Sequence, residues 1–359
     1  MTSATDLPPI ESAIPPRLQC PRTRHKRVPD DYVPPYPSYV ARFPDTVDRV
    51  VMAFFGLQHD AGADPARIRA MLDAAAERFA AADGPGHWDR ATAVDAAGYT
   101  NVTSIAYWTD PAAFARWFEG PAFAPWWNDD ARLADGVGHF VEIVMPRQET
   151  YETLFSSNDR PEGVAMLAAG MSGMVQEHAY WGGARDRMPA SQVDAMQPVG
   201  QPSVDVGGGT LGRRIRVAPH ENLCLIRSGQ DWGDTDDAER AMYFGSVEPA
   251  LREGMDFLRD SARRIGCWDN RYMDVVEADG TPTSKSFAMS WWRGLAELER
   301  WAESHPTHVE IFAAAMRHLS TLGPAARLRL YHEVTVARAA DQRFEYLNCH
   351  PGTGMLRAG

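Results

Sequence analysis

The sequence predicts an α+β fold in which two similar ferredoxin-like halves join their sheets into a barrel-like antiparallel core flanked by helices. Two observations predict this architecture. Segments typical of strands and helices alternate in β-α-β order twice, over about 47–150 and about 220–340. The stretches 105–117 and 289–301 also align, with identical residues at four positions: Trp108 with Trp292, Ala112 with Ala296, Arg116 with Arg300 and Trp117 with Trp301.

The elements of the first half follow from residue patterns. The apolar run RVVMAFFGL over 49–57 predicts a buried strand. Asp64 followed by Pro65 is typical of a helix start, and the apolar residues that follow recur at helical spacing. We expect a strand at 101–108, a helix from Asp110 and a strand at 138–145 to complete this half.

The second half repeats the order of the first. The run NLCLIRS at 222–228 predicts a strand, and a long amphipathic helix is expected over roughly 237–264. The remaining elements are strands at 270–278 and 284–292 on either side of a DGTP turn, helices at 294–303 and 306–320, and a strand at 327–337. In the alignment of the halves, Val141 stands where His332 stands, so one half keeps packing and the other gains chemistry.

The first 46 residues contain 10 of the 26 prolines, which excludes regular helix or central strand. We expect an extended arm over 1–46 that docks on its own domain or on a neighbouring subunit. A single catalytic domain, made of the two halves, is expected over 47–359. The basic run between Arg22 and Arg27 in this arm is consistent with a solvated surface or with an anion patch.

Composition excludes several classes of function. A net charge of -12 and a pI near 5.4 argue against nucleic acid binding, and no apolar run approaches the length of a membrane span. The four cysteines form neither a CxxC nor a CxxCH motif, so neither a zinc ribbon nor covalent haem attachment is indicated. With no signal-like segment at the start, the expected location is the cytoplasm.

Two histidines near the end of the chain lie in contrasting settings. His308 is in a predicted helix, within WAESHPTHVEIF, and His332 is in a predicted strand, within RLRLYHEVTV. A helix histidine and a strand histidine can face one cavity from opposite sides, one binding a haem iron and the other acting beyond it. By spacing alone, His305 competes with His308 as the iron ligand.

Several blocks of the chain carry a more specific signal. They are ESAIPPRLQCPRT, EHAYWGG, LIRSGQDW, GMDFLRD, ERWAESHPTH, LYHEV and YLNCHPGTGMLR. Through these blocks the chain closely resembles the aldoxime dehydratases, haem enzymes that convert aldoximes to nitriles. The resemblance implies an α+β barrel, a non-covalent haem b that is ferrous in the active form, an aldoxime substrate and a homodimer.

The resemblance also assigns roles to individual residues. His308 matches the axial ligand of the haem iron, and His332 matches a distal histidine that serves as acid and base. Ser228 matches a serine that hydrogen-bonds the oxime hydroxyl. Arg187 and Glu152 match an arginine and a carboxylate that support the distal histidine. From the sequence itself, Arg185 remains an alternative to Arg187.

Two departures from the family stand out. Ala288 occupies a position where some relatives carry a pocket asparagine, and the segment between His308 and His332 is about three residues longer, with Gly323 and Pro324 in the expected loop. Two other classes of function remain open: a haem peroxidase-like or chlorite-dismutase-like oxidoreductase, and a haem-binding sensor without turnover. Neither of these classes needs the serine together with the distal histidine.

Overall fold

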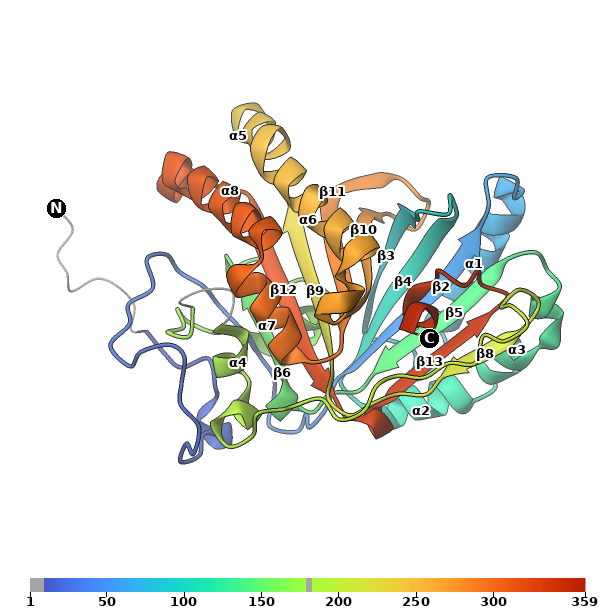
Figure 1. Ribbon diagram of the computed structural model, residues 1–359, viewed down its shortest axis with the longest axis horizontal. Helices are drawn as coiled ribbons and strands as arrows, with labels where there is room; N and C mark the ends of the chain where they lie inside the picture. The colour runs from blue at the N-terminus through green and yellow to red at the C-terminus, as the bar shows by residue number, and fades with distance from the viewer. Residues whose placement is uncertain (1–9, 179–182, 359) are drawn as a thin grey trace.

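The computed structural model describes residues 10–178 and 183–358, and its main feature is one large antiparallel sheet (Figure 1). Residues 1–9 of the predicted arm lie outside the described residues. Across the sheet the strands follow the order β6 (Tyr151–Phe155), β12 (Arg329–Ala337), β9 (Leu223–Asp231), β11 (Pro282–Trp292), β10 (Cys267–Val276), β3 (His87–Val94), β4 (Thr100–Trp108), β2 (Val51–His59), β5 (Gly138–Val144), β13 (Gln342–Leu347) and β8 (Arg214–Val217). A separate pair joins β1 (Ala41–Arg42) to β7 (Gly170–Met171).

Both halves show the same order of elements and the same order of strands. The first half runs β2, α1 (Pro65–Phe79), β3, β4, α2 (Pro111–Glu119) and β5, with the short helix α3 (Ala124–Asn128) before β5. The second runs β9, α5 (Asp237–Met242), α6 (Glu248–Ser261), β10, β11, α7 (Leu295–Ser304), α8 (Pro306–Leu322) and β12. In each half the fourth strand lies beside the first, and the third lies between the first and the second.

The predicted helix starts are confirmed by their capping geometry. The Asp64 carboxylate accepts a hydrogen bond from the backbone N–H of Ala66 at 3.0 Å, and Asp110 accepts one from Ala112 at 2.8 Å. The long helix expected over 237–264 is α5 and α6 joined by a π-helical turn at Tyr243–Val247. Strand β3 of the first half was not predicted.

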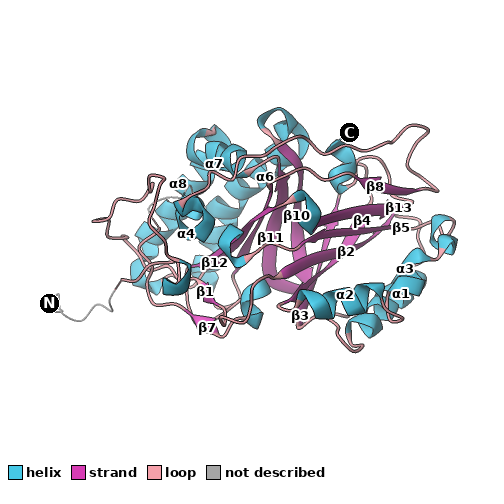
Figure 2. Ribbon diagram, turned by 90° about the horizontal axis from the view of Figure 1, so that it is seen from below, coloured by secondary structure: helices cyan, strands magenta, loops and turns pink. Residues whose placement is uncertain are grey.

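The two halves share one sheet, and the inner faces of their strands pack against each other. Their helices lie outside the strands (Figure 2). Phe54, Tyr107 and Phe140 of the first half share one buried cluster with Phe287 and Trp291 of the second. On the outer face of the first half, α1, α2 and α3 bury an aromatic cluster that includes Val141. On the outer face of the second half, α6 and α7 pack against β9, β11 and β12.

The prediction of a barrel-like core is wrong in one respect: the sheet does not close. Strands β6 and β8 end the eleven-stranded order and do not pair with each other. The free side of β6 is met instead by the arm, where Tyr39 and Phe155 form an antiparallel bridge. Beyond β8, Ala218 bridges Ser203. Short edges covered by irregular segments satisfy backbone groups without closure.

The arm is extended and lies against the body of the protein, next to α4 (Ala184–Arg187) (Figure 1). Glu11 forms a parallel bridge with Val175, and β1 pairs with β7. Arg42 reaches back to the carbonyl oxygens of Ser12 and Ala13. Within residues 10–178 and 183–358, no helix combines the length and apolar character needed to cross a membrane.

Candidate active site

Three of the residues singled out from the sequence form one buried cluster. Arg187 Nε donates to Glu152 Oε2 at 2.6 Å, and Arg187 Nη2 lies 3.3 Å from Glu152 Oε1 and 3.0 Å from His332 Nε2. His332 Nε2 is also 3.0 Å from Glu152 Oε1. All three side chains are buried. The cluster therefore joins a carboxylate, a guanidinium and an imidazole away from bulk water.

Strand register explains how distant parts of the chain meet in this cluster. In the pairing of β6 with β12, Leu154 lies opposite His332 and Glu152 lies opposite Val334. Alternate residues of a strand share a face. Glu152, two residues before Leu154 on β6, therefore lies on the same face of the sheet as His332. Arg187 is the last residue of α4, which contacts β6.

Charges in the cluster oppose the effect of burial. Burial lowers the pKa of His332, the Glu152 carboxylate opposes that shift in part by favouring the imidazolium, and the Arg187 guanidinium adds to it, so this pKa lies below its usual value. Burial tends to raise the pKa of Glu152, but Arg187 and His332 outweigh it, so the pKa of this carboxyl lies below its usual value. Glu152 is therefore an anion, and His332 titrates between a neutral imidazole and an imidazolium held by that anion.

Ser228 lies directly beside His332 on the neighbouring strand. In the register of the sheet, Ser228 of β9 is the partner of His332 on β12 and of Ala288 on β11. Residues directly opposite in antiparallel strands share a face, so these three side chains form a row on the face that α6 and α7 cover. Ala288 adds no hydrogen-bonding group to this row.

His308 lies in the first turns of α8 and is held by α7. Its ring meets the Trp301 ring edge-on, with 4.6 Å between centroids, and hydrogen-bonds the backbone of Ala302. Burial lowers the pKa of His308 to about 4, so the imidazole is neutral at ordinary pH. A neutral imidazole whose ring is fixed by a backbone carbonyl is the state that a metal ligand requires.

The competing histidine, His305, has a different task. Its side chain caps α8 by accepting a hydrogen bond from the backbone N–H of Thr307, and its ring stacks on Phe257 with centroids 4.3 Å apart. The alternative arginine, Arg185, forms an ion pair with Glu299 at 2.7 Å. The structure thus gives His305 and Arg185 other partners.

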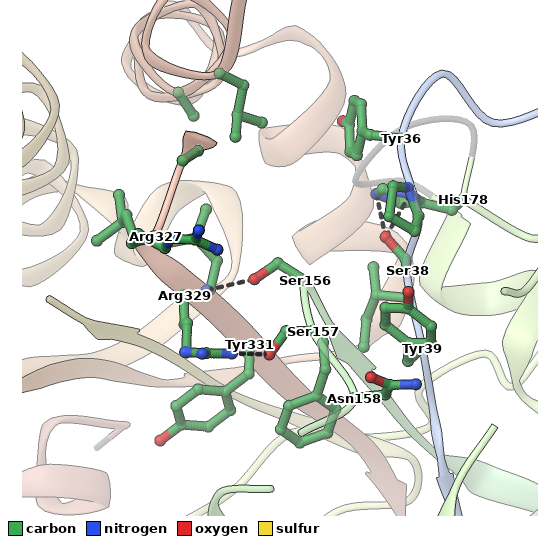
Figure 3. Close-up of a pocket in the computed structure, with 18 of the residues that line it drawn as sticks. Tyr36, Ser38, Tyr39, Ser156, Ser157, Asn158, His178, Arg327, Arg329 and Tyr331 are labelled. Atoms are coloured by element: carbon green, nitrogen blue, oxygen red, sulfur yellow. Dashed lines mark hydrogen bonds between the residues drawn. The ribbon is translucent and has the colours of Figure 1, made fainter. Parts of the chain in front are cut away.

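A cavity of about 430 Å³ lies between the arm, α8 and the beginning of β12 (Figure 3). His332 is on its wall, whereas Ser228 and His308 are not among its lining residues. Much of the lining is apolar or aromatic: Tyr36, Tyr39, Leu154, Ala315, Met316, Leu319, Leu330 and Tyr331. Such a lining beside a polar cluster is typical of a small-molecule site.

Three residues of this cavity, Tyr36, Ser38 and His178, were not predicted from the sequence. Ser38 Oγ lies 2.6 Å from His178 Nδ1, and the Tyr36 ring meets the His178 ring with centroids 4.8 Å apart. Figure 3 shows these side chains on one side of the cavity, opposite Arg327 and Arg329. Burial, with Arg187 and His332 nearby, lowers the pKa of His178 to about 3. The EHAYWGG block contains His178, but nothing in its spacing indicates a cavity wall.

These features fit a non-covalent haem. His308 offers a buried, neutral imidazole on α8, the same helix that contributes Ala315, Met316 and Leu319 to the cavity. Cys20, Cys224, Cys267 and Cys349 are free thiols. A helix that carries one histidine and a strand that carries another, each contributing to one cavity, are the elements expected around a catalytic haem.

Comparisons with known proteins agree with this class of site. The model of the family described as haem-containing dehydratase matches residues 53–355. An aliphatic aldoxime dehydratase of Rhodococcus globerulus is 47% identical over 97% of this chain and 98% of its own. A phenylacetaldoxime dehydratase of Bacillus sp. (strain OxB-1) is 32% identical over 92% of this chain and 94% of its own.

Solved structures give the same result. A crystal structure of an aldoxime dehydratase in complex with butyraldoxime superposes with a TM-score of 0.93 at 43% identity, covering 98% of this chain and 97% of that chain. The chain belongs to the haem-containing dehydratase family, among the aldoxime dehydratases.

Proposed function

We propose that the protein is a haem-dependent lyase that dehydrates aldoximes, R–CH=N–OH, to nitriles and water. The observation that carries this proposal is the buried cluster of Glu152, Arg187 and His332, of which His332 lies on the wall of a cavity beside α8. The relatives named aldoxime dehydratases, and the butyraldoxime bound in one of their structures, support it.

The reaction needs one group that can first give and then take a proton. Hydroxide leaves nitrogen poorly, so its oxygen must be protonated, and the carbon proton must then be removed. His332 suits both steps, because an imidazole can both give and accept a proton, and Glu152 partly offsets the lowering of its pKa by burial. As an imidazolium it donates to the departing hydroxyl oxygen. As a neutral imidazole it then accepts the proton from carbon.

Glu152 and Arg187 set the state of His332 between these steps. The Glu152 anion stabilises the imidazolium, and Arg187 keeps Glu152 ionised in a buried site. Ser228, beside His332 in the sheet register, orients the oxime hydroxyl toward the imidazole. Apolar walls from the arm and α8 exclude water from the reacting group.

His308 would hold the haem, which we propose to be a non-covalent haem b. When bound with ferrous iron, it would supply an electron-rich metal centre that coordinates the oxime nitrogen and donates electron density toward the N–O bond. The electrons balance without an oxidant, since dehydration breaks the N–O and C–H bonds and forms the third C–N bond and an O–H bond of water. The peroxidase-like and sensor alternatives are not favoured, since neither accounts for the aldoxime dehydratase relatives.

Redox dependence tests the proposal. Purified, haem-loaded protein given an alkyl aldoxime is expected to form nitrile when reduced with dithionite under anaerobic conditions and to form little when ferric. Softer ferrous iron favours nitrogen ligands, whereas ferric iron favours the oxime oxygen. Nitrile measured by gas chromatography decides the point. Equal turnover by the ferric protein would refute the nitrogen-bound mechanism.

Glu152→Gln is expected to move the pH dependence of turnover. The Glu152 anion raises the pKa of His332, so its replacement by a neutral amide lowers that pKa further. Since the imidazolium predominates only below its pKa, the pH above which turnover declines should move downward. The measurement is kcat against pH in both proteins. An unchanged or upward-shifted profile would contradict the role of Glu152.

We also propose the broader organisation expected from the sequence. It consists of an arm over 1–46 and one catalytic domain over 47–359, whose two halves are ferredoxin-like units. Their shared strand order supports this division. We further propose a cytoplasmic homodimer, with free cysteines supporting a reducing compartment.

A further inference from the structure

The arm contacts the two carboxylates that flank Arg187 in space. Arg187 uses Nε and Nη2 on the acid–base cluster, which leaves Nη1 at the other edge of the guanidinium. That nitrogen donates to the backbone carbonyl oxygen of Glu177 at 2.7 Å. The orientation of the guanidinium therefore depends on where Glu177 is held.

Glu177 is held by the beginning of the arm. Its Oε2 accepts a hydrogen bond from the backbone N–H of Ala13 at 2.7 Å, and its Oε1 accepts one from Ser12 Oγ at 3.1 Å. Lys26 Nζ lies 3.6 Å from the same oxygen. Two residues before Glu177, Val175 forms a parallel bridge with Glu11 of the arm. The arm thus fixes both the side chain and the backbone at Glu177.

Asp186, the residue before Arg187, is held by a later part of the arm. Its Oδ2 accepts hydrogen bonds from the backbone N–H groups of Arg27 and Val28, each at 2.7 Å. Asp186 is 1% exposed and Glu177 is 3% exposed. Buried carboxylates that accept backbone N–H bonds are costly to disturb, so these contacts are rigid supports.

We propose that arm residues 11–28 position Arg187 for its part in the reaction, with Glu177 and Asp186 as the positioning residues; this rests on the proposed function. Arg187 contacts His332 directly, and both carboxylates act through Arg187. Small displacements of a positioned group are enough to reduce turnover strongly.

The test compares two replacements of Asp186 in the full-length, haem-loaded protein. Asp186→Ala removes the acceptor of both arm N–H groups, whereas Asp186→Asn keeps an oxygen there. We expect turnover per bound haem to fall roughly 10-fold to 10²-fold in Asp186→Ala. It should stay within about twofold of the parent in Asp186→Asn. Asp194 is an exposed residue of the same segment, and Asp194→Ala is the matched control.

Two readouts separate positioning from a purely structural role. The C–O stretching frequency of the ferrous carbon monoxide complex reports the charge facing the iron. It should move in Asp186→Ala in the same direction as in Arg187→Gln. In the double variant Asp186→Ala/Arg187→Gln, turnover should equal that of Arg187→Gln alone, because residues acting through one group are not additive. Glu177→Ala should behave like Asp186→Ala and provides a second variant.

The outcomes are distinct. If Arg187→Gln leaves turnover unchanged, the proposed role of Arg187 itself fails. If Arg187→Gln is impaired, the inference about the arm is overturned by either of two results. One is a lower melting temperature in Asp186→Ala and Glu177→Ala with unchanged turnover and carbon monoxide band. The other is an additive loss in the double variant.

Discussion

His332→Ala is expected to bind haem normally and to lose at least about 10²-fold in turnover, the lower end for removal of a positioned acid–base group. His332 lies on β12 and the proposed iron ligand on α8, so the replacement leaves the haem ligand in place. The ferrous protein should therefore still show an aldoxime-induced change in its absorption spectrum. Turnover is measured per bound haem, from the Soret absorbance.

A second buried histidine provides the control for His332. His350 is also buried and paired with a carboxylate, Asp95 at 2.8 Å, but it lies outside the cavity of the candidate site. His350→Ala removes a similar side chain and should keep turnover per haem within about twofold. Near-normal nitrile formation by His332→Ala would contradict the acid–base role and direct attention to Arg187 and Glu152.

His308→Ala is expected to abolish or severely weaken haem uptake. The imidazole is the proposed iron ligand, and its ring is already oriented by Trp301 and by the backbone of Ala302. Titration of the haem-free protein with haem, followed by the Soret band, measures the loss. Added imidazole should partly restore the band, because it supplies the missing ligand.

His305→Ala is the matched control on the same helix. Its loss removes the cap of α8 and should lower the free energy of unfolding by about 1 kcal/mol. Haem uptake should remain. The reverse pattern, with haem lost in His305→Ala and kept in His308→Ala, would overturn the ligand assignment.

Local features of the fold could be predicted because they depend on nearby residues. The helix starts at Asp64 and Asp110 follow from an acidic cap and a proline, and the structure confirms both. Closure of the sheet could not be predicted in this way, because it depends on whether β6 and β8, far apart in the sequence, pair. They do not.

In the candidate site, too, local patterns could be predicted from the sequence and long-range contacts could not. His332 and Ser228 lie in apolar strand patterns, and sheet register places them opposite each other. The partners of Arg187 could not be read from spacing, because Glu152 is on the unpredicted strand β6 and the Glu177 carbonyl follows a segment held by the arm. Long-range contacts of this kind leave no periodic pattern in the sequence.

The fourth strands of the two halves differ in what surrounds the matching position. Val141 on β5 lies in an aromatic cluster with Trp117, Phe123 and Trp127 under the helices of the first half. On β12, His332 faces a cavity instead. The alignment of the halves correctly indicated that Val141 packs, but it gave no measure of the space beside His332.

The stoichiometry of one reaction decides whether the protein dehydrates aldoximes without net redox change. Haem-loaded protein is reduced anaerobically with a measured amount of dithionite and given a large excess of an alkyl aldoxime. We expect one nitrile for each aldoxime consumed, over many turnovers, with no further reductant used. Consumption of reductant or added peroxide in proportion to product, or products other than nitrile, would contradict it.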